Sequence, residues 1–300
     1  MRDAIKQGVS PMLAIQMVTI NAAQLLEKSR WIGTISPGRA ADILIMSDLV
    51  NVTIDQVFAD GILVAENGKM VLEFTPYEYP EWALQSVHVA PLTEGDFRIP
   101  AEKKVKVRVM RIFPGMVHSK EEYAEIEPVN GALQADPARD LAKVAIFYRH
   151  EPRPEVTKTR SLGFMTGLRL KPNSAFASTV SHDCHNLQVL GNDDHAMALA
   201  ANELIRVGGG HCIVVDGKVE AVMAMPLGGL MSLDSVEQAA DQLKTIEAGL
   251  KKAGATQDSV EMTISLLGLI VLEELHLSNQ GLVELRPGEL PKFVDLVVAE

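Results

Sequence analysis

The stretch over residues 76–100 most constrains the fold, because it carries prolines, aromatic residues and charges without a sustained hydrophobic period. A segment of this composition is typical of a surface connector, since it has no continuous apolar face to bury. It divides the 300 residues into a short part, 1–75, and a long part, 101–300. We therefore expect two unlike structural units and an overall fold of the α/β (α+β) class.

The short part is expected to start with helices and to continue as a small antiparallel sheet. Ser10-Pro11 is typical of a helix start, with a capping hydroxyl followed by proline at the first helical position, and a second short helix is expected over residues 21–26. Farther on, Asp60-Gly61 and Asn67-Gly68 favour tight hairpin turns. The sheet predicted over residues 40–75 has too few strands to enclose a core, so we expect an incomplete domain with exposed apolar surface.

The long part alternates between strand-like and helical patterns, which predicts a mixed α/β domain. Strands are expected near residues 105–109, 141–148 and 163–170, and amphipathic helices over residues 194–206 and 236–253. Asn192 or Asp193 is expected to cap the first helix, and Asp234 the second. The three glycines 208–210 follow a helix, whereas a phosphate-binding loop precedes one, so we interpret them as a helix stop.

Charge, cysteine usage and hydropathy exclude several classes of protein. The chain holds 28 basic and 39 acidic residues, so its net charge of -11 repels a phosphate backbone and we expect no nucleic acid partner. Two cysteines, Cys184 and Cys212, are too few for a disulfide framework and indicate a cytoplasmic protein. No secretory signal is expected, and the longest apolar run, 264–272, is far shorter than the ~20 residues that span a bilayer. We expect no membrane partner.

The densest polar group is a six-residue stretch ending at Asn186, which holds two imidazoles, a carboxylate, a thiol and an amide. A transition metal would accept His182 and His185 together with Asp183 or Cys184 as ligands. A proton-transfer site would use a histidine oriented by a neighbouring carboxylate. The same side chains would also suit hydrogen bonds to the backbone where a strand meets a loop, or the edge of an active site or subunit contact. All of these interpretations remain open for the candidate catalytic residues. We expect His182, Asp183 and His185 to converge on a polar pocket, which requires the backbone to turn between the two histidines, because a continuous strand would place them on opposite sides.

Five further residues are weaker candidates for substrate binding. Arg149 and His150 end a strand-like run, where polar side chains commonly face solvent. His195 falls in the first turn of a predicted helix, where a positive charge is disfavoured and a neutral imidazole seeks a partner. Gly228-Gly229 comes just before another helix and could present backbone amides to a ligand, although a single glycine pair is a weak motif.

Taken in order, these motifs resemble a known family. The Pro-Gly-Arg-Ala-Ala-Asp sequence at residues 37–42, preceded by residues 17–23, resembles the closing portion of an amidohydrolase-superfamily enzyme. Four later segments resemble, in the same order, the C-terminal domain of bacterial adenine deaminases: residues 181–186, 191–194, 208–210 and 226–232. The resemblance covers essentially the whole chain. It implies the end of an amidohydrolase barrel and a β-sandwich remnant over residues 1–75, a connector over 76–100 and the mixed α/β C-terminal domain of adenine deaminases over 101–300.

The resemblance also implies a reaction, the hydrolysis of adenine to hypoxanthine and ammonia in purine salvage or catabolism. In the intact family enzyme a divalent metal, Mn²⁺ or another, activates the attacking water. The superfamily binds its metals with a set that includes a His-x-His pair, which this sequence lacks. We therefore carry over no metal ligand and expect the metal-binding barrel to be absent from this chain. The chain alone is expected to bind no metal and to be inactive.

Two functions from different classes follow from these observations. The first is an adenine deaminase that acts on adenine, of which this chain is either a fragment or a part that works with a separately encoded barrel or as a homo-oligomer. The second is a non-catalytic oligomerisation or small-ligand-binding module derived from adenine deaminase.

Overall fold

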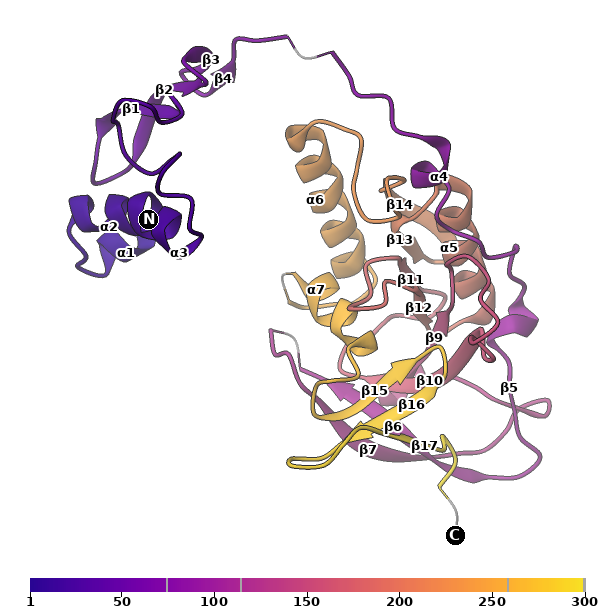
Figure 1. Ribbon diagram of the computed structural model, residues 1–300. Coiled ribbons are helices and arrows are strands. Elements are labelled where there is room, and N and C mark those ends of the chain that lie inside the picture. The colour runs from indigo at the N-terminus through magenta and orange to yellow at the C-terminus, as the bar shows by residue number, and fades with distance from the viewer. Residues whose placement is uncertain (74, 114, 258, 299–300) are drawn as a thin grey trace. The chain divides into compact units, whose positions relative to one another are not determined.

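The computed structural model describes residues 1–73, 75–113, 115–257 and 259–298. It divides into two compact units, Met1–Glu78 and Tyr79–Glu300 (Figure 1). None of the described helices is both long and apolar enough to cross a membrane.

The first unit begins with three short helices, α1 (Arg2–Lys6), α2 (Pro11–Val18) and α3 (Ile20–Leu25). The Ser10 hydroxyl accepts a hydrogen bond from the Leu13 amide at 3.4 Å and so satisfies one of the unpaired donors at the start of α2. Both helices predicted after residue 9 are confirmed.

A four-stranded antiparallel sheet follows the helices, with its strands in the order β1-β2-β3-β4. The strands are β1 (Ile43–Asp48), β2 (Thr53–Ala59), β3 (Ile62–Glu66) and β4 (Lys69–Met70). The turns Asp60-Gly61 and Asn67-Gly68 have positive φ at both residues, which is the geometry that closes a two-residue hairpin. Both predicted hairpins are confirmed.

Little of this first unit is buried. The buried hydrophobic side chains among its described residues are Ala14, Ala23 and Val52, while Leu25 and Ile35 are each 84% exposed. A unit that buries so little apolar surface gains little hydrophobic stabilisation by itself. The expected exposed apolar surface is therefore present.

The second unit is built on an eight-stranded sheet with the order β14-β13-β11-β12-β9-β10-β6-β7. Neighbouring strands run antiparallel except for β6 and β10, which run parallel. The strands are β6 (Val105–Ile112), β7 (Ser119–Ile126), β9 (Ala142–Phe147), β10 (Arg160–Thr166), β11 (Ala175–Ser178), β12 (Leu187–Gly191), β13 (Gly210–Val215) and β14 (Lys218–Ala224). The mixed α/β class is confirmed.

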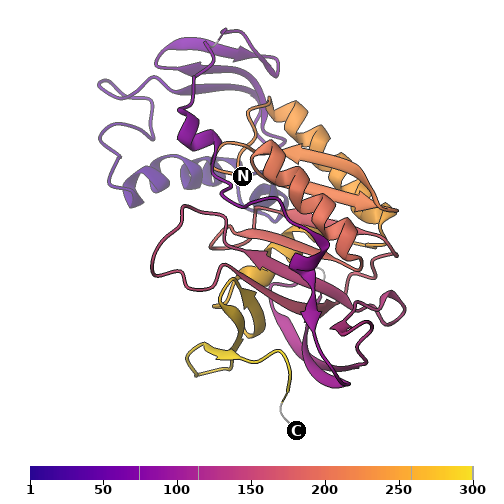
Figure 2. The ribbon, with the colours of Figure 1, turned by 90° about the vertical axis from the view of Figure 1, so that its right-hand side faces the viewer.

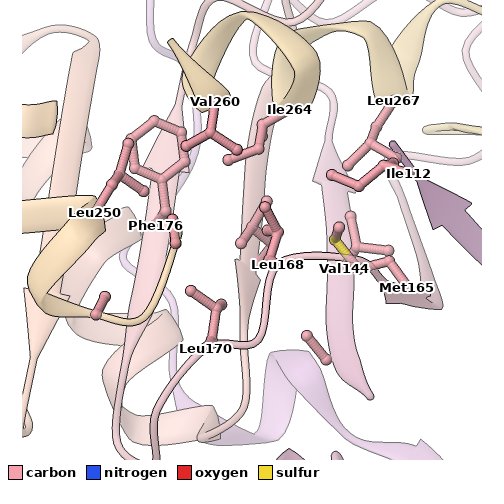
Figure 3. Packing of buried hydrophobic residues seen from close by; sticks show 14 of the residues in the cluster. Ile112, Val144, Met165, Leu168, Leu170, Phe176, Leu250, Val260, Ile264 and Leu267 are labelled. Carbon is pink, nitrogen blue, oxygen red and sulfur yellow. The ribbon is translucent and has the colours of Figure 1, made fainter. Parts of the chain in front are cut away.

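Helices cover both faces of this sheet (Figure 1). Helix α5 (Asp194–Val207) packs on one face, and α6 (Val236–Lys252) and α7 (Val260–Ser265) pack on the other. Figure 3 shows Leu250, Val260 and Ile264 pointing toward the sheet residue Phe176 in one of the two resulting cores.

The helix ends agree with the sequence except at the start of α6. The carboxylate of Asp193 caps α5, and Gly208 ends it with a φ of 85°. The predicted cap of α6, Asp234, is wrong. The cap is the next residue, Ser235, whose hydroxyl accepts a hydrogen bond from the Gln238 backbone amide, while the Gln238 side-chain oxygen accepts one from the Ser235 backbone amide.

The stretch over residues 76–100 contains more structure than a connector. It includes α4 (Glu81–Leu84), a 3-10 turn, η1 (Glu94–Phe97), and strand β5 (Ile99–Pro100), which pairs with β8 (Ala132–Leu133). Figure 2 shows this segment running beside α5. Two anchors hold it there, because Leu92 exchanges hydrogen bonds with the Asn202 side chain and Phe97 is fully buried.

The C-terminal strands form a small sheet of their own, β15 (Glu274–Ser278), β16 (Gly281–Leu285) and β17 (Lys292–Val294). An ion-pair network joins this sheet to the large one, because the buried Glu121 carboxylate of β7 contacts both Arg108 of β6 and Arg286.

Candidate functional site

Most of the candidate residues lie at one edge of the large sheet, where five strands begin or end. The antiparallel register places Phe147, the last residue of β9, opposite Leu187, the first of β12. In the same way Ser178 at the end of β11 lies opposite His211 near the start of β13, whose neighbour β14 ends at the same edge. Loops that are distant in the sequence therefore meet here.

Arg149 occupies the centre of this edge, two residues beyond β9, and it is 1% exposed. Its Nε donates to the carbonyl of His185 at 2.5 Å and its Nη2 to the carbonyl of Gly228 at 3.0 Å. Its Nη1 donates to the carbonyl and the hydroxyl of Ser86, at 2.8 and 3.0 Å. One guanidinium thus joins three separate segments of the chain.

The oxygens that accept hydrogen bonds from Arg149 are all uncharged carbonyl or hydroxyl oxygens. Among the residues that the structure describes, no carboxylate forms an ion pair with Arg149. Burial lowers the pKa of Arg149 to about 10, so it remains charged at neutral pH. A buried charge is tolerated only when hydrogen bonds satisfy it. The carbonyls are consequently held in place by Arg149, and its donors point into the protein rather than toward a ligand.

The polar stretch identified in the sequence forms a turn between β11 and β12. Its two imidazoles meet edge to face, with the ring centres of His182 and His185 separated by 5.2 Å. His185 adopts a φ of 47°, which turns the backbone and brings both rings to one side. Asp183 does not join them, because its side chain is 78% exposed and lies 3.9 Å from His182. The expected convergence of all three side chains is wrong for Asp183.

His150 also contacts this turn, through a 2.7 Å hydrogen bond between its Nε2 and the carbonyl of Cys184. Burial lowers the pKa of both His150 and His185, and the charge of Arg149 contributes in both cases. The imidazoles are therefore kept neutral at neutral pH. A neutral imidazole both donates and accepts hydrogen bonds, so the cluster is suited to proton transfer.

Two polar atoms of the turn are buried without a hydrogen-bond partner among the described residues, Nδ1 of His185 and Oδ1 of Asn186. Asn186 uses its amide nitrogen to reach the Asn279 side chain at 3.3 Å. Buried polar atoms are normally paired, and exceptions are often found at functional positions. In the described part of the chain, however, no three His, Cys, Asp or Glu side chains are grouped so that they could hold a metal ion.

The two glycines 228 and 229 belong to the same site. The carbonyl of Gly229 accepts a 2.5 Å hydrogen bond from the Thr179 hydroxyl, which in turn accepts from the Gly210 amide. A Cβ on Gly229 would lie 2.7 Å from Nη1 of Arg149, and one on Gly209 would lie 2.7 Å from the Gly229 backbone. Glycine is required here because the backbone approaches the guanidinium too closely for any side chain.

His195 lies elsewhere, in the first turn of α5. Its Nδ1 is 3.0 Å from the carboxylate of Glu94, and both side chains are about two-thirds exposed. The pair borders an open cavity of about 420 Å³ that is also lined by Leu92, Leu199 and Asn202. The structure therefore brings together the candidates Arg149, His150, His182, His185, Asn186, Gly228 and Gly229 but not His195.

Sequence reasoning missed three members of the site. Ser86 stood in a stretch interpreted as a connector, and Thr179 carried no motif. Gly209 was interpreted only as part of a helix stop, which Gly208 alone provides through its left-handed conformation. The run of three glycines was the one available signal, because a helix stop needs a single glycine and the others indicate close backbone approach.

Comparison with known proteins identifies the family. The model described as the adenine deaminase C-terminal domain matches residues 117–289, and that of the amidohydrolase family matches residues 1–64. Three relatives named adenine deaminase come from Clostridium botulinum (strain ATCC 19397 / Type A), Rubrobacter xylanophilus and Moorella thermoacetica. The Clostridium relative is 40% identical over 302 residues, which is 100% of this chain. The Rubrobacter relative is 42% identical over 288 residues, or 94% of this chain, and the Moorella relative is 42% identical over 300 residues, or 99%. These matches are 49%, 47% and 49% of the relatives, so the chain spans about half of their length.

The amidohydrolase match over residues 1–64 and the match over residues 117–289 define the class, a chain that joins an amidohydrolase-family segment to an adenine deaminase C-terminal domain. Within that class the chain belongs to the adenine deaminase family, as its motifs indicated.

The glycine pair provides a test of the Arg149 centre. Gly228 and Gly229 have similar positive φ values, 65° and 72°, so alanine at either position costs about 1–2 kcal/mol of backbone strain. Only Gly229→Ala also displaces the buried guanidinium, and we expect about 3 kcal/mol of additional destabilisation. Urea unfolding of both variants measures the difference. Equal losses of stability would show that Arg149 does not depend on Gly229.

The neutral imidazoles predict acid sensitivity. Because the folded pKa of His150 and His185 is lowered, the unfolded chain binds more protons below pH ~6.5, and stability falls as the pH drops from there toward the folded values. His185→Gln should reduce this slope, part of which remains because burial lowers the pKa of His211 to about 4. Unfolding free energies measured between pH 5 and 8 test this, with His195→Gln as the exposed control. An unchanged slope in His185→Gln would contradict the interpretation.

Proposed function

We propose that this chain supplies the C-terminal half of an adenine deaminase, which hydrolyses adenine to hypoxanthine and ammonia. The observation that carries the proposal is the 40% identity to a curated adenine deaminase across the whole chain. Similarity at this level extends over both units, so it includes the segment that matches the amidohydrolase family.

The family implies a divalent metal, Mn²⁺ or another, whose chemistry is the activation of water. The described residues of this chain do not fit such a metal, because no three suitable side chains are grouped. The metal would therefore be held by the part of the intact enzyme that this chain does not cover, since the chain spans about half of the relative's length.

The contribution of this chain is to shape the edge of the substrate site with the turn at residues 182–186. The observations in its favour are the lowered pKa of His185, the unpaired Nδ1 of the same imidazole and the rigid support from Arg149. Such a turn can donate or accept a proton, or orient a purine by hydrogen bonds, without binding the metal itself.

A second function, a non-catalytic oligomerisation or ligand-binding module, is favoured by one observation. The first unit leaves large apolar side chains exposed, among them Leu25, Trp31 and Ile35. Extended apolar surface of this kind marks interaction sites in stable proteins.

An adenine deamination assay distinguishes the two functions. The purified chain alone, with or without Mn²⁺, should show no turnover, because it lacks a group of metal ligands among its described residues. Mixing it with the amidohydrolase half of the Clostridium botulinum relative should restore activity. Metal-dependent turnover by the chain alone, in a preparation free of host deaminase, would overturn the assignment of the metal to the other half. A mixture that forms a complex without turnover would favour the non-catalytic module.

The role of the turn is tested in a complete homologous enzyme. Replacing the counterparts of His182 and His185 by alanine should lower kcat/KM at least tenfold, about 1.4 kcal/mol of transition-state stabilisation, with only a small change in Tm. Replacing the counterpart of His195 is the matched control, since that imidazole is exposed and lies outside the cluster. A collapse of stability with unchanged activity per folded molecule would show that the turn is purely structural.

A further inference from the structure

A small cavity lies beside the turn at residues 182–186. Its polar lining residues are Cys184 and Asn186 of the turn, Ser181 just before it and Ser278 at the end of β15, and the other lining residues are glycine or aliphatic. The cavity has a volume of about 20 Å³. One buried water needs about 10–15 Å³ measured in this way. The cavity therefore has room for a single molecule of that size.

The wall of the cavity that faces the turn is made of closely packed backbone. A Cβ on Gly268 would lie 2.5 Å from Oγ of Ser181 and 2.9 Å from the carbonyl oxygen of His182. The His182 amide donates to the carbonyl of Ser265 at 2.9 Å and fixes this segment against the turn. Because the wall is held by main-chain contacts, it cannot collapse onto a polar atom that lines the cavity.

The atoms that line the cavity mostly accept hydrogen bonds. Asn186 is 3% exposed, and its Oδ1 has no partner among the described residues. The hydroxyls of Ser181 and Ser278 donate elsewhere, to the side-chain oxygen of Gln188 at 2.8 Å and to a main-chain carbonyl at 3.1 Å, so each can only accept from a molecule in the cavity. The thiol of Cys184 is a weak donor. A ligand must therefore donate hydrogen bonds, which excludes an anion.

Charge distinguishes between the two smallest donors, water and an ammonium ion. The residues that line the cavity include no carboxylate in the part of the chain that the structure describes. The buried guanidinium of Arg149 is bound to the carbonyl of His185, the residue next to Asn186. A second cation placed near this guanidinium without a counter-charge would be unfavourable. The site thus favours the neutral donor.

We propose that this cavity binds one ordered water molecule, which donates to Oδ1 of Asn186 and to a serine hydroxyl and so provides the turn with a second support besides Arg149. Buried waters typically make about three hydrogen bonds to polar groups that would otherwise be unsatisfied, which is what these lining atoms offer. This inference goes beyond the proposed function and holds whether or not the chain takes part in deamination.

The experiment is a crystal structure of the full 300-residue chain at a resolution that shows ordered waters, with a second crystal soaked in Tl⁺, a probe with the size of ammonium. We expect density for one water within hydrogen-bonding distance of Oδ1 of Asn186 and no anomalous signal from Tl⁺ in the cavity. Asn186→Leu removes the acceptor at similar volume and should lose the water. The control, Asn279→Ala, removes the partner of Nδ2 of Asn186 but leaves Oδ1 in place, and it should keep the water.

Four results would overturn the proposal. These are a cavity without density in the unmodified chain, a water that persists in Asn186→Leu, loss of the water in both variants, and a Tl⁺ peak in the cavity, which would assign it to a cation. If Asn186→Leu does not fold, nuclear magnetic resonance of the unmodified chain still decides the question. The side-chain amide of Asn186 should receive magnetisation from a long-lived water, and the lack of such transfer would contradict the proposal.

Discussion

The guanidinium of Arg149 is the interaction on which the candidate site depends, because a charge that is 99% buried must have its hydrogen-bonding groups satisfied. Its partners are a hydroxyl and main-chain carbonyls from three segments, and backbone oxygens can be brought to one point only if the backbone itself is fixed. The sheet provides that rigidity, since β9, β11 and β14 end at the edge where β12 and β13 begin. The requirement for glycine at residue 229 follows from the same crowding.

The absence of a carboxylate partner among the described residues has an electrostatic consequence. A neutralised arginine would have little influence on its neighbours, whereas Arg149 adds to the burial that lowers the pKa of His150 and His185. One buried cation therefore does two things: it fixes the backbone of the turn, and it adds to the effect of burial in lowering the pKa of two imidazoles. By contrast, the equally buried Lys143 is paired with Asp194 at 2.7 Å, which is the usual way to stabilise a buried cation.

Local features of the structure were predictable from the sequence, and features that depend on distant contacts were not. Asp-Gly and Asn-Gly turns, the Ser10-Pro11 helix start and the amphipathic helices α5 and α6 are set by neighbouring residues, so they were predicted with small errors such as Asp234 for Ser235. The dense polar stretch was correctly expected to turn. Its connection to Arg149 and Gly229 was not predictable, because those residues meet only through strand pairing across the sheet.

Sequence similarity and geometry answer different questions about function. Similarity across the whole chain assigns the family, and through it the reaction proposed here, although nothing in the described residues would hold the metal. Geometry instead identifies what this half can contribute, namely a rigid edge that presents neutral imidazoles. Rigidity matters for such a contribution, because a proton donor or acceptor is effective only when it is held close to the reacting atom. Under the function proposed here, a domain without metal ligands would contribute by holding the imidazoles in fixed positions. A buried guanidinium bound to backbone carbonyls provides that rigidity.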